Sequence, residues 1–99
     1  MKQEKYNIFL DSPVGLLSGS LDLCPEQDDV SGHIMMMGHT TEIAHGKMED
    51  DVRDFCGTIW FEGNEVSFHA MGLLTDGMLE LDVSIGSRTF ALTGFPVRT

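Results

Sequence analysis

Residues 76–92, DGMLELDVSIGSRTFAL, carry the clearest fold signal in this chain of 99 residues. Apolar residues alternate with polar ones on both sides of Gly86-Ser87, and Asp76-Gly77 opens the segment. Both dipeptides are typical of two-residue β-hairpin turns. A slip of one residue would move every apolar side chain to the other face, so the pattern predicts a β-meander with one buried side. The predicted cross-strand pairs are Leu74 with Leu79, Ala70 with Val83, Val83 with Phe90, and Leu81 with Leu92.

Two further dipeptides extend the meander toward the N-terminus. Gly63-Asn64 and Gly38-His39 are interpreted as two-residue turns, each flanked by alternating apolar residues. The pairs predicted from them are Phe61 with Val66, Ile59 with Phe68, Met36 with Thr41, and Ile34 with Ile43. Every one of these pairs except Met36 with Thr41 is apolar on both sides.

The remaining turn and loop segments complete the predicted strand order. Four strands fall between about residues 56 and 94, and an opening strand is expected over 6–10. Loops over 11–15 and 24–29 separate the others. The sequence therefore predicts about eight short antiparallel strands in one domain spanning 1–99.

A short phrase recurs in these segments: a small or polar residue, then glycine, then apolar residues two and four positions after the glycine. It appears as SGSLDL (18–23), SGHIMM (31–36), CGTIWF (56–61) and DGMLEL (76–81). The alternate apolar residues give each strand one buried face. The glycine is interpreted as the residue that starts each strand, at a turn or at a close backbone approach.

Eight strands in this order fold either as a closed or nearly closed up-and-down β-barrel or as a two-sheet β-sandwich. The barrel is the favoured prediction and the sandwich its alternative. In strand number and connectivity the chain resembles the small calycin-type barrels, the lipocalin and avidin architecture, although it carries no motif of those families. The resemblance implies the barrel fold and does not define a function.

The predicted inner face is almost entirely aliphatic or aromatic, and side chains can fill a barrel of eight short strands. We therefore expect a packed core in preference to a ligand cavity. The predicted inner residues are Leu21, Leu23, Ile34, Met36, Ile43, Ile59, Phe61, Val66, Phe68, Leu79, Leu81, Val83, Ile85, Phe90 and Leu92.

Charge and composition exclude several classes of partner. A net charge of −10 and a pI near 4.5 disfavour nucleic acid and anionic membrane surfaces, which attract basic proteins. The first apolar run is broken at Asp11, too early for a secretory signal, and no segment has the apolar length of a membrane span. We expect a cytoplasmic protein in which Cys24 and Cys56 are reduced thiols.

The chain offers no motif for catalysis or for a cofactor. Neither cysteine has a histidine obviously placed beside it, and His69 is expected on the outer face opposite Thr58. The best metal candidates are His33, Met35, Met37 and His39, whose soft ligands suit Cu(I). Alternate side chains on one strand lie about 6–7 Å apart, so these residues alone cannot converge on an ion. We expect no metal, no cofactor and no enzymatic activity.

Function is therefore sought on the outer surface. Large apolar residues expected to face outward are Phe9, Met35, Met37, Trp60, Met71 and Met78. If such residues cluster, they mark an interface. The sequence thus predicts a non-catalytic domain that acts by self-association or by binding a protein partner. A carrier of a small apolar ligand is the alternative, with the ligand at a barrel mouth near Thr41, His45 and Arg88. An enzyme accessory domain is the third interpretation.

Overall fold

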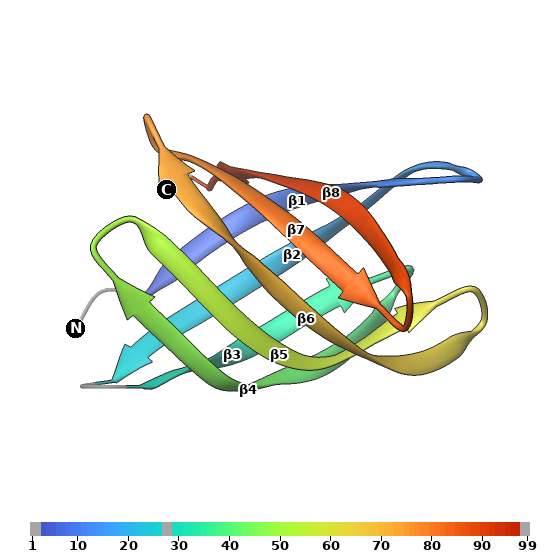
Figure 1. Ribbon diagram of the computed structural model, residues 1–99, viewed down its shortest axis with the longest axis horizontal. Helices are drawn as coiled ribbons and strands as arrows, with labels where there is room; N and C mark the ends of the chain where they lie inside the picture. The colour runs from blue at the N-terminus through green and yellow to red at the C-terminus, as the bar shows by residue number, and fades with distance from the viewer. Residues whose placement is uncertain (1–2, 27–28, 98–99) are drawn as a thin grey trace.

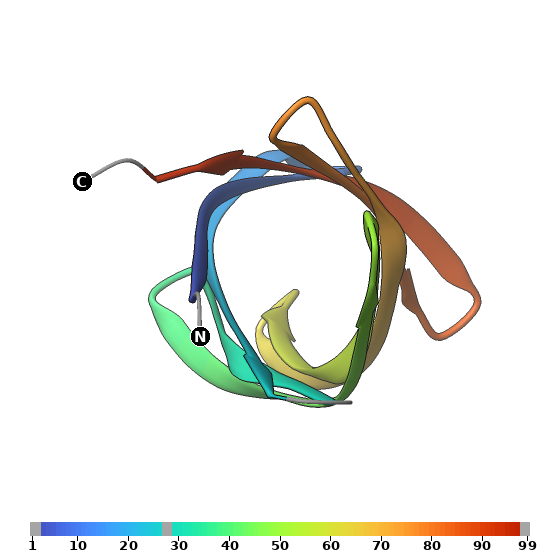
Figure 2. The same cartoon turned by 90° about the vertical axis from the view of Figure 1, so that its left-hand side faces the viewer.

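The computed structural model describes residues 3–26 and 29–97, and within these ranges every regular element is a β-strand. Each strand pairs antiparallel with the next, and β1 pairs with β8, so the sheet closes into a barrel (Figure 1). The strands are β1 (Glu4–Ser12), β2 (Gly15–Glu26), β3 (Asp29–Met36), β4 (His39–Glu49), β5 (Val52–Phe61), β6 (Asn64–Thr75), β7 (Met78–Ile85) and β8 (Arg88–Pro96). The end view displays the closed ring (Figure 2).

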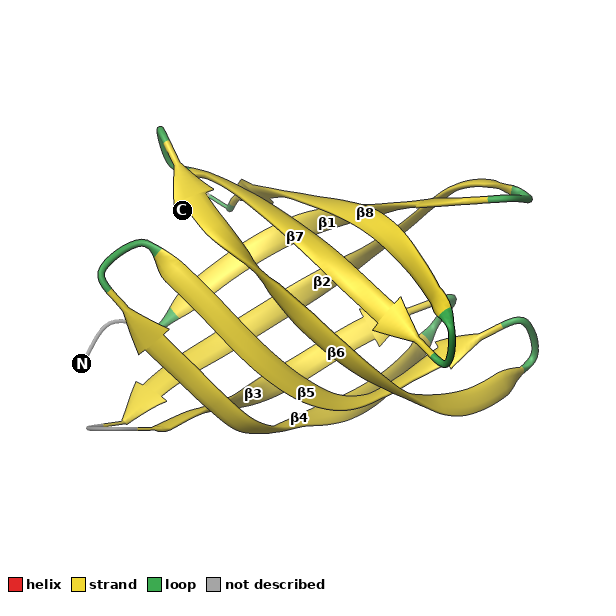
Figure 3. Cartoon of the chain, viewed as in Figure 1, coloured by secondary structure: helices red, strands yellow, loops and turns green. Residues whose placement is uncertain are grey.

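The predicted barrel is confirmed, and the sandwich alternative is excluded by the pairing of β1 with β8. The strands are longer than expected, and the connections within the described ranges are short turns (Figure 3). The opening strand, for example, spans Glu4–Ser12 and not only residues 6–10. No helix long and apolar enough to cross a membrane occurs in the described ranges.

The barrel interior is a single apolar core, and every predicted inner residue except Val66 is buried in it. Val66 is half-buried and packs against the edge of this core. Six core residues stand outside the predicted inner set: Tyr6, Ile8, Leu10, Val30, Phe55 and Ala70. The outward facing predicted for Phe9 and the predicted pair of Ala70 with Val83 nevertheless agree with the burial of Ile8, Leu10 and Ala70.

The turns at Asp76-Gly77 and Gly86-Ser87 are confirmed, with all four predicted pairs across them. The predicted turns at Gly63-Asn64 and Gly38-His39 are wrong by one residue. Strand pairing places these turns at Glu62-Gly63 and Met37-Gly38, so that Phe61 pairs with Asn64 and Met36 pairs with His39.

The reason for this correction is the backbone conformation of the two turns. Glu62 and Gly63 have φ of 54° and 80°, and Met37 and Gly38 have 56° and 79°. Two consecutive positive φ angles are the mark of a type I′ turn, which suits the twist of a hairpin and places glycine second. A turn one residue earlier moves each cross-strand partner by two residues. Because side chains alternate along a strand with a period of two, the inner and outer faces stay as predicted.

The recurring glycines do not start the strands, so their interpretation as strand-starting residues is wrong. Gly19, Gly32 and Gly57 lie inside β2, β3 and β5, and only Gly77 lies in a turn. A Cβ atom at Gly19 would lie 2.0 Å from the carbonyl oxygen of Met35, and one at Gly57 would lie 2.5 Å from that of Glu42. These glycines therefore let neighbouring strands approach closely where the sheet bends into a small barrel.

Candidate binding surface

The outer residues proposed as an interface are spread around the barrel. Met35, Met37 and Met71 are exposed, whereas Phe9, Trp60 and Met78 are half-buried. Phe9 lies on β1, Met35 on β3, Trp60 on β5, Met71 on β6 and Met78 on β7. The outward direction of these side chains is as expected, but the residues belong to several separate surfaces.

One of these surfaces holds the residues suggested as soft-metal ligands. His33 and Met35 are exposed on β3, and Met37 is the first residue of the turn that follows. The ring of His39 stacks on the indole of Trp60, with centroids 3.9 Å apart and an interplanar angle of 18°. In the part of the chain that the structure describes, no group of three or more His, Cys, Asp or Glu residues could hold a metal ion.

A second surface brings together residues that the sequence analysis kept apart. His69 lies opposite Cys56 and not opposite Thr58, because the hairpin turn sits one residue earlier than predicted. The Nε2 atom of His69 is 2.6 Å from an oxygen of Asp54. A histidine thus does lie beside Cys56, contrary to expectation. The His69 side chain is 48% exposed, however, and a nucleophile–base pair works best in a site that excludes water.

One end of the barrel is closed by a polar network that the sequence analysis missed. The side chain of Arg53 is only 6% exposed and donates to both carboxylate oxygens of Glu4, at 3.3 and 3.1 Å. Tyr6 donates to the same carboxylate at 2.8 Å. Burial, together with this hydrogen bond, raises the pKa of the Tyr6 phenol well above its usual value. Arg53 also donates to the carbonyl oxygen of Asp50, so the network ties the strand ends to a turn.

The residues proposed at a ligand mouth have structural partners. The Thr41 hydroxyl donates to the carbonyl oxygen of Thr58, so it forms a hydrogen bond between β4 and β5. Arg88 pairs with Glu62, and its guanidinium lies 5.4 and 5.3 Å from the ring centroids of Phe61 and Phe90. Arg88 therefore covers core rings at that end of the barrel. The side chain of His45 lies outside the described part of the structure.

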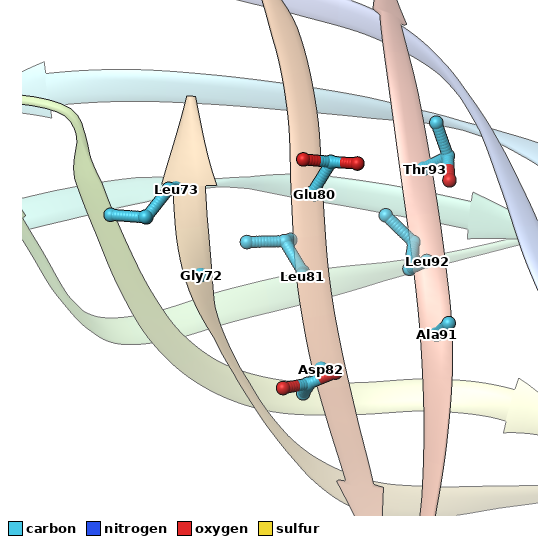
Figure 4. A pocket seen from close by; sticks show the side chains of 8 residues that line it. All are labelled: Gly72, Leu73, Glu80, Leu81, Asp82, Ala91, Leu92 and Thr93. Atoms are coloured by element: carbon cyan, nitrogen blue, oxygen red, sulfur yellow. The ribbon is translucent and has the colours of Figure 1, made fainter. Parts of the chain in front are cut away.

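The outer face of β8 is hollowed on both sides. A hollow of about 390 Å³ lies toward β6 and β7, and a second of about 510 Å³ lies toward β1 and β2. The first is lined by Gly72, Leu73, Glu80, Leu81, Asp82, Ala91, Leu92 and Thr93 (Figure 4). The second is lined by Phe9, Asp11, Leu16, Ala91, Thr93 and Phe95. Because both hollows share Ala91 and Thr93, they form one surface, which we call the β8 groove.

Strand pairing sets the order of side chains across the β8 groove. Thr93 pairs with Glu80 on β7 and with Phe9 on β1, so a carboxylate and an aromatic ring flank a small side chain. Ala91 pairs with Asp82 in the next outward row. The groove thus has a floor of small residues, an acidic wall on β7 with Leu73 beyond it on β6, and a mainly apolar wall on β1 and β2 that also holds the carboxylate of Asp11.

The apolar wall contains large side chains in contact with solvent. Phe9 and Phe95 meet edge to face with centroids 5.8 Å apart. Leu16 is 67% exposed and Phe95 is 46% exposed. Of these residues, only Phe9 was predicted from the sequence as part of an interface. The sequence signal for this wall is that residues 89–97 contain no charged residue. Phe95 follows the inner residue Leu92 by three positions, which places it on the outward side of the strand.

No protein-family model matches the chain, and no curated protein and no solved structure matches it either. A groove with aromatic and aliphatic side chains on one side and carboxylates on the other can bind an amphipathic ligand.

Proposed function

We propose that this barrel is a non-catalytic binding module that holds a polypeptide segment in the β8 groove. The observation that carries the proposal is the exposed apolar wall of Phe9, Leu16 and Phe95 beside a hollow of about 510 Å³. Full burial of a large apolar side chain contributes about 1.5–3 kcal/mol, so covering Leu16 and Phe95 would favour binding substantially. Aromatic side chains in hollows are frequent anchors of protein interfaces.

The absence of catalysis is part of the proposal. Its support is that Cys56 lies opposite His69 on the outer face of the sheet, where the histidine side chain is 48% exposed. Most inward-facing side chains are apolar, and the buried polar side chains at one barrel end, Arg53 and Tyr6, are already hydrogen-bonded to Glu4. A small-ligand carrier has less support, because Arg88 packs over Phe61 and Phe90 at the end where its site was expected.

Self-association through Trp60 and the Met35 strand stays a separate prediction, since those residues lie on β5 and β3 and not along the β8 groove. A cytoplasmic setting also stays a proposal. Its support is that Cys24 and Cys56 are both free thiols.

Selection of peptides from a random displayed library tests the binding function. Peptides enriched on the wild-type barrel should lose about tenfold or more in affinity for Phe95→Ser, because an aromatic anchor contributes at least 1.4 kcal/mol. Met35→Ser is the matched control, since it removes an exposed apolar side chain on β3. Affinities would be measured by fluorescence anisotropy. Selected peptides that bind Phe95→Ser as well as wild type would contradict the proposal.

A further inference from the structure

The two walls of the β8 groove differ in chemistry, and we infer that its occupant is an extended segment in which basic and apolar residues alternate. The inference rests on the proposed function and adds the chemistry of the partner. Its basis is the row formed by Glu80, Thr93 and Phe9, which places a carboxylate and an aromatic ring on opposite sides of one strand.

The acidic wall has the spacing of an extended peptide. Glu80 and Asp82 are exposed and lie two residues apart on the outward side of β7 (Figure 4). Alternate residues of a strand are about 6.6–6.8 Å apart. Basic side chains at alternate positions of an extended segment repeat at the same distance and can meet both carboxylates.

The width of the groove also fits one extended chain. β7 and β1 flank β8, and two inter-strand spacings amount to about 10 Å. The floor between them is low because its outward residues, Ala91 and Thr93, are small. Side chains of an extended segment point alternately to opposite sides, so one set would face Glu80 and Asp82 and the other would face Phe9 and Leu16, with Asp11 beside Leu16.

A second copy of this chain is a poor source of the basic residues. The chain has six Lys and Arg residues and a net charge of −10. Arg53 and Arg88 are already paired with Glu4 and Glu62. A second copy would therefore bring additional negative charge to Glu80 and Asp82, whereas a basic segment from another protein would complement them.

The test uses a labelled peptide that alternates Lys and Leu over nine residues, the length of β8. Two comparison peptides have Glu in place of Lys, or the same Lys and Leu residues in separate blocks. Fluorescence anisotropy at low and high salt should give the tightest binding for the alternating Lys–Leu peptide. Its affinity should fall as salt rises, because the carboxylates lie at the surface.

Paired variants separate the inference from the proposed function. Glu80→Gln with Asp82→Asn should weaken binding of the alternating Lys–Leu peptide about fivefold or more, because it removes both carboxylates that would pair with the lysines. Glu42→Gln with Glu65→Gln removes the same charge from β4 and β6 and should change binding less than about twofold. Phe95→Ser should weaken all peptides that bind.

The outcomes distinguish the inferred chemistry of the partner from the proposed binding function. Equal binding of the Lys–Leu and Glu–Leu peptides, or equal losses in the two charge-removing variants, would overturn the inference about the partner's charge. The proposed function would still stand if Phe95→Ser weakened binding in that case. Equal binding of the alternating and block peptides would overturn the extended, alternating form of the occupant. A wild-type protein that binds none of the peptides would overturn the inference, and undiminished binding by Phe95→Ser would overturn both claims.

Discussion

Substitution of Gly19 by alanine tests whether the recurring glycines permit barrel closure. Gly19 lies on the inner side of β2, opposite Met36 on β3. A Cβ atom there would lie 2.0 Å from the carbonyl oxygen of Met35, a backbone atom that cannot rotate away. The two strands would have to separate by about 1 Å to bring this distance to 3.0 Å, below which real Cβ contacts essentially never occur.

The expected cost follows from that separation. Ladder hydrogen bonds near 2.9 Å would lengthen beyond their effective range, and each contributes about 1 kcal/mol net. Losing about two of them, with overpacking strain of about 1–3 kcal/mol, gives a total of about 3–5 kcal/mol. Gly94→Ala is the matched control, because its nearest atom, Cβ of Leu79, lies at 3.1 Å and needs to move only slightly. We expect that control to cost about 1 kcal/mol or less.

The assay is urea unfolding followed by the fluorescence of Trp60, the one tryptophan of the chain. A Cβ atom at Gly57 would lie 2.5 Å from its nearest atom, so the loss in free energy of unfolding for Gly57→Ala should fall between those for Gly19→Ala and Gly94→Ala. If Gly19→Ala does not fold, the steric explanation still requires a larger loss in free energy of unfolding for Gly57→Ala than for Gly94→Ala. Equal losses in free energy of unfolding for Gly57→Ala and Gly94→Ala, or a Gly19→Ala loss no larger than theirs, would refute the steric explanation.

Three further outcomes are expected. Phe68→Ala should lower the free energy of unfolding by about 2–5 kcal/mol, whereas Ser67→Ala on the exposed side of the same strand should change it little. Equal losses for the two variants in urea unfolding would overturn the assignment of inner and outer faces. Tyr6 is the one tyrosine, so its absorbance should titrate above the usual phenol pKa of about 10. Because the unfolded chain loses this proton first, stability should fall as pH rises above about 10, and Tyr6→Phe should reduce that fall. A homodimer through Trp60 and Met35 should tighten as salt screens the charge of −10, and Trp60→Glu with Met35→Glu should abolish it; wild-type sedimentation as a monomer at both salts would contradict this prediction.

The alternation of apolar residues predicted which side chains face inward, because this property depends only on the period of two along a strand. Even where the turns at Gly63-Asn64 and Gly38-His39 were assigned one residue late, the pairing changed by two and the faces were unaffected. Strand order followed from the same local signals, since consecutive strands joined by short turns must be neighbours.

Closure of the barrel and the details of its surface depend on contacts between distant residues. The pairing of β1 with β8, the approach of Met35 to Gly19 and the meeting of Arg53 with Glu4 each join separate parts of the sequence. The β8 groove belongs to this class as well, because its acidic wall comes from β7 and its apolar wall from β1 and β2. Alternation assigns each side chain to a face, but only the closed and twisted sheet determines which strands become neighbours and at what register.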